Sequence, residues 1–174
     1  QAGQMEGLVS GLVEFSRAEL SIERLNLNTL VARSVELVCN QGRFKGVEWE
    51  MYPGESLPEL MGDPGQLHQV FLNLFLNAKD AMPKGGWLSV RTSLDGDRAI
   101  AEVADTGSGI PNEHLARIYD PFFTTKAMNQ GTGLGLSITY GIVQEHGGTI
   151  TCDSSVGQGT RFTLTLPLAS ASGR

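Results

Sequence analysis

Two asparagines four residues apart have types and spacing suited to chemistry. Asn73 and Asn77 lie in a segment, residues 63 to 82, that we expect to be helical, so their side chains emerge one turn apart on one face. Amide oxygens at that spacing can converge on one hard cation, and Mg²⁺ takes only one or two protein oxygens beside nucleotide phosphates. The alternative is an ordinary solvated helix face, although such faces usually favour better helix formers than Asn.

A carboxylate is predicted to face an apolar interior further along the chain. If residues 98 to 105 form a strand, period-two alternation places Asp105 on the face of Ala99, Ala101 and Val103. A carboxylate there needs hydrogen-bond donors, and the amino group of a purine is one candidate. A turn-forming Asp before Thr106-Gly107-Ser108-Gly109 is the alternative, and the spacing leaves both open.

A glycine-rich segment, Gly131-Thr132-Gly133-Leu134-Gly135-Leu136, lies where a loop is expected to become a helix. Free backbone N–H groups at a helix start form an anion site, and glycines let phosphate oxygens approach the backbone. The pattern alone is weak evidence, because neither the dinucleotide-binding nor the Walker pattern is present. Lys126, just upstream, could add a charge to the same phosphates, with a plain exposed lysine as the alternative.

Three helices are expected to position these residues. The first follows Asn28 as N-cap and buries a stripe from Leu30 to Val38. In the second, over 63 to 82, Asp63 is the predicted N-cap, Pro64 the first helical residue, and Gln66 closes a capping box. The third runs from Gly133 to about His146 and ends at Gly147-Gly148. On the second helix the predicted core stripe is Leu67, Val70, Phe71, Leu74, Ala78 and Ala81, and the polar stripe is Gln66, Asn73, Asn77 and Asp80.

Strands are expected between these helices. Residues 47 to 52 alternate and end at Pro53-Gly54, and Asp95-Gly96 indicates a hairpin between two half-solvated strands. Two last strands, Thr149 to Ser154 and Thr160 to Leu166, flank Gly157-Gln158-Gly159. The order of elements predicts an α+β fold: a two-layer sandwich of a mixed, mostly antiparallel sheet with helices on one face.

A short coiled-coil-like helix is expected before this domain. Its apolar residues follow the alternating three and four spacing of a seam, which needs a second helix or another copy of the chain as partner; packing onto its own domain is the alternative. The seam residues are Met5, Leu8, Leu12, Phe15 and Ile22.

Composition limits the class of protein. The 174 residues suffice for one domain, and the 40% apolar content with no long apolar run is typical of a folded chain without a membrane-spanning helix. The net charge of −6 disfavours nucleic acid as a partner. Glycine is abundant, at 22 residues, which indicates special loops. Cys39 and Cys152 are expected to be unpaired buried residues in a reducing cytoplasm, and the start at Gln1 suggests a fragment.

Taken in order, five segments resemble the catalytic domain of sensor histidine kinases, within the ATPase superfamily shared with gyrase, mismatch-repair and chaperone ATPases. The resemblance covers roughly residues 25 to 168. The sequences Asn77-Ala78-x-Asp80-Ala81 and Phe122-Phe123-Thr124-Thr125-Lys126 are most similar to those of the nitrogen-regulation type of kinase. The segments are Asn73-x-x-x-Asn77-Ala78-x-Asp80-Ala81, Asp105-x-Gly107-x-Gly109-Ile110, Pro121-Phe122-Phe123-Thr124-Thr125-Lys126, Gly131-x-Gly133-x-Gly135-Leu136 and Gly157-x-Gly159-Thr160.

The resemblance implies a role for each matching residue. Asp105 would accept the adenine amino group of ATP with Thr160 as a second partner, Asn77 with Asn73 would hold Mg²⁺, and Lys126 would join these asparagines in catalysis. The turn at Gly107 and Gly109 would line the base pocket, and residues 112 to 130 would form a lid. The remaining expected nucleotide contacts are Asp80, Ile110, Phe122, Phe123, Thr124, Thr125, Gly131, Thr132, Gly133, Leu134, Gly135 and Leu136.

Departures from the family pattern limit the chemistry. Some members carry Lys where this chain has Asp80, and the gyrase-like relatives have a water-activating Glu where it has Asn73, so efficient ATP hydrolysis is not expected. His68, His114 and His146 do not fit the phosphoacceptor motif of the family. His68 lies inside the nucleotide helix, and His114 and His146 read as solvated surface residues.

The implied protein is a kinase whose catalytic domain, residues 25 to 168, follows the end of a dimerisation helix at 1 to 24 and precedes a tail at 169 to 174. Autophosphorylation would need a histidine on the dimerisation helices of the full-length protein, which is expected to be a homodimer. An aspartate of a response regulator would then receive the phosphoryl group. Two alternatives stay open: a degenerate nucleotide-binding module that positions a partner, and a serine kinase or anti-sigma factor on the same fold.

Overall fold

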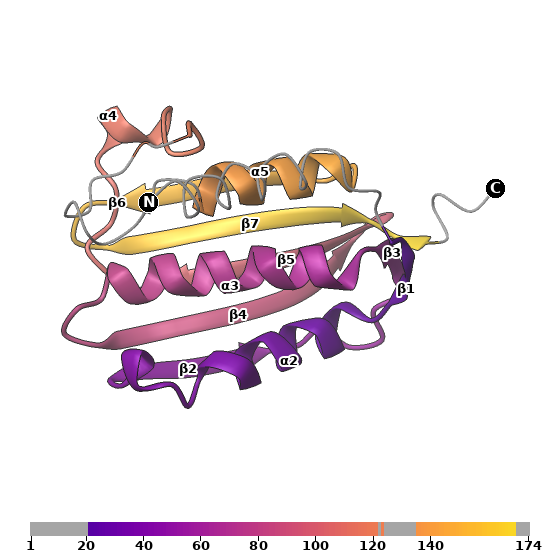
Figure 1. Ribbon diagram of the computed structural model, residues 1–174, viewed down its shortest axis with the longest axis horizontal. Helices are drawn as coiled ribbons and strands as arrows, with labels where there is room; N and C mark the ends of the chain where they lie inside the picture. The colour runs from indigo at the N-terminus through magenta and orange to yellow at the C-terminus, as the bar shows by residue number, and fades with distance from the viewer. Residues whose placement is uncertain (1–20, 122, 124–134, 170–174) are drawn as a thin grey trace, which may run out of the picture.

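A five-stranded mixed sheet carries its helices on one face, as the computed structural model shows for residues 21–121, 123 and 135–169 (Figure 1). The sheet order is β2-β4-β5-β7-β6. In chain order the elements are β1 (Glu23–Leu25), α2 (Leu27–Val38), a 3-10 turn (Gly42–Phe44), β2 (Val47–Tyr52), β3 (Leu60–Gly62), α3 (Pro64–Asp80), β4 (Gly86–Asp95), β5 (Arg98–Asp105), α4 (Asn112–Leu115), α5 (Gly135–Glu145), β6 (Thr149–Ser155) and β7 (Gly159–Pro167).

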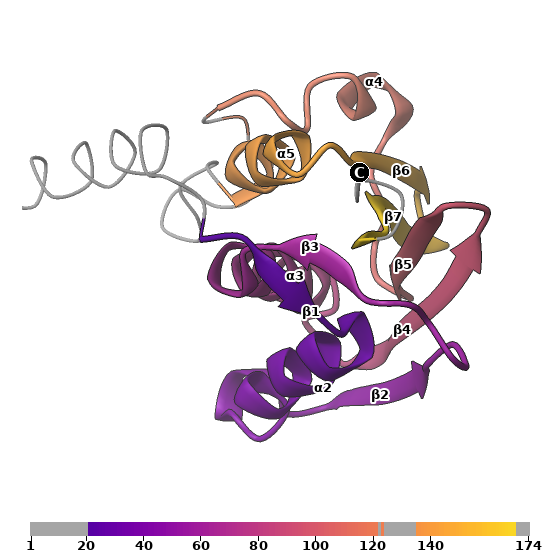
Figure 2. The same ribbon diagram turned by 90° about the vertical axis from the view of Figure 1, so that its right-hand side faces the viewer.

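The pairing confirms the predicted fold class. β2 runs parallel to β4, and the other neighbours in the sheet are antiparallel. The β4–β5 hairpin turns at the predicted Asp95-Gly96, and its register places Leu88 opposite Asp105. A second ladder, β1 with β3, was not expected; it lies at the end of the sandwich where β3 leads into α3 (Figure 2). Residues 23 and 24, assigned above to the preceding helix, lie in this ladder.

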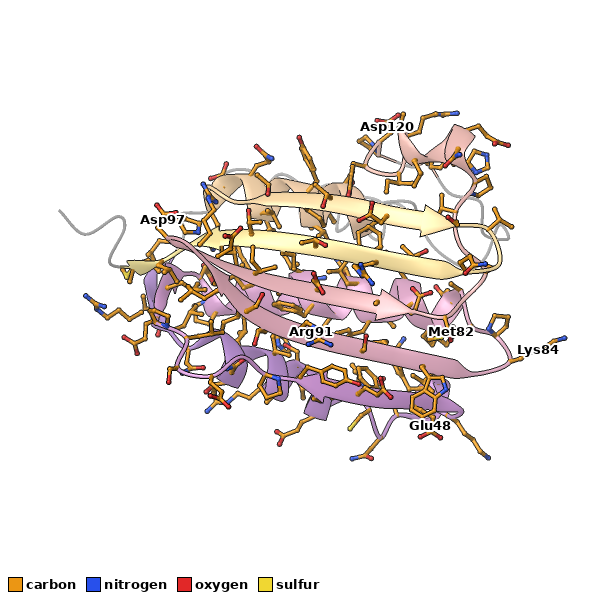
Figure 3. The ribbon with its side chains drawn as sticks, turned by 180° about the vertical axis from the view of Figure 1, so that it is seen from behind. Glu48, Met82, Lys84, Arg91, Asp97 and Asp120 are labelled. Carbon is orange, nitrogen blue, oxygen red and sulfur yellow. The ribbon has the colours of Figure 1, made fainter. Side chains whose placement is uncertain are left out.

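The core lies between the sheet and the helices. Period-two alternation turns Leu88, Val90, Ala99, Ala101, Val103, Phe162 and Leu164 toward the helices, where all are buried. Trp49 packs edge-on against Phe75 of α3, with ring centroids 5.2 Å apart. The other face of the sheet carries polar side chains, and no helix among the described residues covers it (Figure 3). There Arg91 lies over the ring of Tyr52, 4.4 Å from its centroid.

Helix α2 begins earlier than predicted. Its N-cap is Asn26, whose side chain accepts the N–H of Thr29 at 3.0 Å, and the prediction of Asn28 was wrong. The Asn28 amide instead donates to the Gly54 carbonyl at 2.9 Å and accepts the Thr92 hydroxyl, so it links α2 to the sheet. Because its side chain bonds Gly54 and Thr92, Asn28 does not cap the helix.

Helix α3 begins as predicted but its cap differs in one contact. Asp63 accepts the N–H of Gln66 at 3.2 Å and Pro64 opens the helix. The predicted capping box does not close, because the Asp63 N–H donates to His146 Nε2 instead. His146 is only 9% exposed, so its assignment to the solvated surface was wrong. Ala81, placed above in the core stripe, is half-buried beyond the helix end, and Phe75 is the core residue that the stripe omitted.

Other expectations have mixed outcomes. Helix α5 ends at Glu145, and Gly147 and Gly148 follow as its expected C-cap, with the N–H of Gly148 donating to the Val143 carbonyl. Cys39 and Cys152 are both unpaired but only half-buried. Within the described ranges no helix is long and apolar enough to span a bilayer. Most of the predicted seam, Met5, Leu8, Leu12 and Phe15, lies outside the described residues, so a preceding coiled-coil helix stays a prediction. Its last member, Ile22, was wrongly included, because it lies outside any helix and is exposed.

Candidate functional site

Asp105 ends β5 on the helix-facing side of the sheet, as the alternation predicted. Its Oδ1 accepts the N–H of Gly107 at 2.8 Å, so the turn interpretation is correct too. Burial raises the pKa of the Asp105 carboxyl, and hydrogen bonds from the backbone N–H groups of Gly107 and Thr160 partly offset that rise. The site therefore holds an acceptor that is incompletely solvated and suited to an incoming donor.

A row of polar side chains crosses three strands beside this carboxylate. Thr160 pairs with Asp105 on one side and with Ser154 on the other. Thr160 Oγ1 lies 2.8 Å from Ser154 Oγ. The Ser154 hydroxyl also accepts the Ile110 N–H at 2.7 Å and donates to the Gly159 carbonyl at 3.0 Å. Ser154 was missed by the sequence analysis; it holds Ile110 and Thr160, both expected nucleotide contacts, at fixed positions.

The loop after Asp105 is fixed between α3 and the β6–β7 turn. Ser108 donates its N–H to the Ala81 carbonyl at 3.0 Å and accepts that of Gly157 at 2.8 Å. A Cβ on Gly107 would lie 2.5 Å from the Ala81 carbonyl oxygen. Gly109 has φ +79, and a Cβ there would lie 2.1 Å from the Ser155 carbonyl oxygen. Both glycines are thus required by close backbone approach.

Both asparagines are half-buried on α3, and Asn73 lies where this helix meets α5. Asn73 Nδ2 donates to the Gly135 carbonyl at 3.1 Å and to the Thr139 hydroxyl at 3.2 Å, while its Oδ1 accepts from Gln69 at 3.1 Å. Asn77 follows one turn closer to the loop at Gly107. Asp80 is exposed and forms an ion pair with Lys79 at 3.3 Å.

These donors fit a cation that binds nucleotide phosphates. Among the described residues no group of three His, Cys, Asp or Glu side chains could hold a metal ion by itself. Amide oxygens are neutral hard ligands and bring no charge to balance that of Mg²⁺. The ion therefore needs phosphate oxygens of a nucleotide, besides water, to complete its coordination. The donor set therefore suits Mg²⁺ only together with a nucleotide.

The start of α5 supplies the third side of the site. The helix begins at Gly135, and Leu136 is half-buried in its first turn. Phe123 is half-buried too, with Arg117 4.6 Å above its ring and His114 5.5 Å away. The other predicted contacts lie outside the described residues: Phe122, Thr124, Thr125, Lys126, Gly131, Thr132, Gly133 and Leu134. Asn73 thus contacts Gly135, and the turn after Asp105 contacts the end of α3 at Ala81. The roles predicted for the other residues stay predictions.

Comparison with known proteins agrees with this arrangement. The family described as histidine kinase-, DNA gyrase B-, and HSP90-like ATPase matches residues 62–170. The sensor histidine kinase ZraS of Escherichia coli strain K12 is 40% identical over 169 residues, covering 97% of this chain and 36% of ZraS. The chain thus spans about a third of that relative's length. Sensor kinase CckA of Brucella abortus is 40% identical over 182 residues, 95% of this chain and 19% of CckA.

Solved structures of histidine kinases share the fold. Full-length ShkA in complex with AMPPNP superposes with a TM-score of 0.81 at 31% identity, over 95% of this chain and 36% of that one. Histidine kinase ThkA in complex with the response regulator TrrA has a TM-score of 0.78 at 26% identity, over 98% of this chain and 49% of that one. The resemblance to sensor histidine kinases is confirmed, while the nitrogen-regulation subtype stays a prediction. The chain belongs to the family of histidine kinase-, DNA gyrase B-, and HSP90-like ATPases.

Proposed function

We propose that this domain binds Mg-ATP and presents the γ-phosphoryl group to a histidine on dimerisation helices of the same protein. The observation that carries the proposal is Asp105, a half-buried acceptor of raised pKa beside a glycine turn that backbone contacts hold in place. An adenine amino group is a donor and suits this carboxylate. A guanine carbonyl in the same place would set two acceptors against each other, so ATP is the expected nucleotide.

The phosphate end of the site lies between α3 and α5. Asn73 and Asn77 would hold Mg²⁺, which neutralises charge on the phosphates, and the N–H groups at the start of α5 would bind phosphate oxygens. Lys126 and the glycines at 131 and 133 are proposed to add to this cradle. Catalysis would rest on positioning and charge stabilisation, as expected for phosphoryl transfer.

The residue types at the site favour transfer to a protein group over hydrolysis. Asn73 has no basic carboxylate, and its amide is engaged by Gly135 and Thr139. It therefore has no means of deprotonating water. The same protein's histidine, brought by its helix pair, would be the nucleophile, and an aspartate of a response regulator would receive the phosphoryl group afterwards.

None of the histidines in the described residues suits the acceptor role. His68 lies 2.7 Å from the Ser34 hydroxyl between α2 and α3. His146 is buried with both ring nitrogens engaged. His114 is half-buried against Phe123. This supports an acceptor on the dimerisation helices, and the ShkA–AMPPNP and ThkA–TrrA complexes support nucleotide and response regulator as ligands of such domains.

Phosphoryl transfer in trans tests the proposal. The chain is mixed with γ-labelled ATP, Mg²⁺ and a separately produced two-helix hairpin that carries the acceptor motif of the parent kinase. Label that appears on the hairpin, is acid-labile and is lost with Asp105→Asn is expected. A chain that binds ATP but labels no hairpin would favour the binding-module alternative, and labelling of serine would favour the serine kinase.

A further inference from the structure

His146 joins the C-terminal end of α5 to the N-terminal end of α3. Its Nε2 accepts the backbone N–H of Asp63 at 3.0 Å, and its Nδ1 lies 2.8 Å from the carbonyl oxygen of Ile142. A carbonyl oxygen only accepts and a backbone N–H only donates, so the proton is on Nδ1 and not on Nε2. The ring is therefore neutral, with one tautomer fixed and both nitrogens in use.

The surroundings leave this ring little freedom. A Cβ on Gly62 would lie 3.1 Å from His146 Cδ2, so the ring packs directly on the backbone that leads into α3. Asp63 caps α3 with its side chain, and His146 satisfies the N–H of the same residue. Gly147, with φ +74, ends α5 immediately after the ring. Both helix ends are thus fixed to one another by a single side chain.

A second polar contact joins the same two helices at the other end of their interface. There Asn73 donates to the Gly135 carbonyl and the Thr139 hydroxyl, in the first two turns of α5. Asp63 and Asn73 are separated by about three turns of α3, and the two helices lie side by side along that length (Figures 1 and 2). Two contacts far apart along one interface fix both the sliding and the tilt of α5 against α3.

We propose that His146 is a positioning residue for nucleotide binding. By holding the far end of α5, it keeps the start of that helix at the depth where it contacts Asn73. The inference rests on the proposed function, since it concerns the phosphate and Mg²⁺ end of the same site. The base end is built on β5, β7 and the loop at Gly107, which the His146 contact does not touch.

Because His146 supports only the phosphate end of the site, its loss should weaken binding of the phosphates and not of the base. In His146→Phe the ring volume stays and both hydrogen bonds are lost. Loss of a buried hydrogen bond at a helix contact should reduce Mg-ATP affinity about five- to tenfold. Adenosine affinity, measured by NMR titration, should stay within about twofold of wild type. The ratio of the two affinities is independent of overall stability, because both ligands bind the same folded state.

Two further variants separate positioning from packing. His146→Gln retains an acceptor at the end of the side chain and should restore most of the Mg-ATP affinity. His68→Phe is the matched control, because it removes the same ring from α3 at its contact with Ser34 of α2 and should leave the ratio unchanged. Failure of Gln to restore affinity, or an equal change of the ratio in His68→Phe, would overturn the inference.

Failures of the two proposals are distinguishable. A wild-type chain that binds no Mg-ATP would refute the proposed function. A wild-type chain that binds it, with an unchanged ratio in His146→Phe, would refute only the role of His146. Should that variant not fold, the ¹⁵N shifts of the wild-type ring decide. We expect the Nδ1–H tautomer with and without Mg-ATP, and an Nε2–H ring in the nucleotide complex would contradict the inference.

Discussion

Two glycines in the β6–β7 turn provide a matched test of the nucleotide site's architecture. Gly157 has φ +81 and Gly159 has φ +109, so alanine is strained at both. They differ in their surroundings. A Cβ on Gly157 would meet nothing within 4 Å, whereas one on Gly159 would lie 2.0 Å from the carbonyl oxygen of Asp105 and 3.1 Å from the Cα of Thr106. Gly159→Ala must therefore push β7 away from β5 beside Asp105.

The expected cost follows from these two terms. Alanine at a positive φ loses roughly 1 to 2 kcal/mol, which is the whole effect expected for Gly157→Ala. Overpacking against a backbone oxygen adds roughly 1 to 3 kcal/mol. Gly159→Ala should thus lose about 2 to 5 kcal/mol in total, a large part of a typical domain stability. It should also weaken ATP binding, because Asp105 and Thr160 face each other at this point.

Urea unfolding followed by circular dichroism measures the difference. With an m-value of about 2 kcal/mol per molar, the midpoint of Gly159→Ala should lie about 1 M below that of Gly157→Ala. The m-values should agree, so that the shift reports stability. Equal midpoints for the two variants would refute the close approach of β7 to Asp105, and equal midpoints with full ATP affinity would refute the site's geometry.

Two further predictions concern Asp105 and the core. Burial raises the pKa of the Asp105 carboxyl, so above that pKa its ionised form destabilises the nucleotide-free fold. Asp105→Asn should therefore raise the melting temperature at neutral pH. This gain should disappear as the pH falls through the raised pKa, because the carboxyl is then protonated. No gain at neutral pH would refute the burial cost. Phe75→Ala should lose about 3 to 5 kcal/mol, because this fully buried ring packs on Trp49. The free energy of unfolding is measured by tryptophan fluorescence in a Trp87→Phe background, where Trp49 is the only tryptophan. Leu94→Ala, at an exposed position, is the control, and a loss below about 1 kcal/mol in Phe75→Ala would contradict the packing.

Local patterns in the sequence predicted most of the fold. The hairpin at Asp95-Gly96, the cap at Asp63 and the inward face of Asp105 each depend on neighbours a few residues away, and the structure confirms them. The inward direction of Asp105 was predictable because side chains along a strand alternate between its two faces, and the buried residues of β5 fix which face Asp105 shares. The glycines at 107 and 109 were predictable as a turn, although their packing on Ala81 and Ser155 was not.

Contacts between distant segments explain the failures. Asn26 and Asn28 are equally good caps by type, and the choice was made by Gly54 and Thr92, which lie far along the chain. His146 was assigned to the surface because nothing near it in sequence indicates a partner, yet it contacts Asp63 across 83 residues. Ser154 alternates with other small polar residues in β6, so no local signal marks it as the support of Thr160.

Calorimetric titration with nucleotides tests the central claim most directly. Wild-type chain and Asp105→Asn are titrated with ATP and GTP, with and without Mg²⁺, after thermal melts confirm that both are folded. We predict Mg²⁺-dependent binding of ATP, much weaker binding of GTP, and at least a tenfold loss of ATP affinity in Asp105→Asn, consistent with loss of a charged hydrogen-bond partner. Equal affinity of wild type and Asp105→Asn for ATP, or no preference for ATP over GTP, would contradict the assignment of adenine to Asp105.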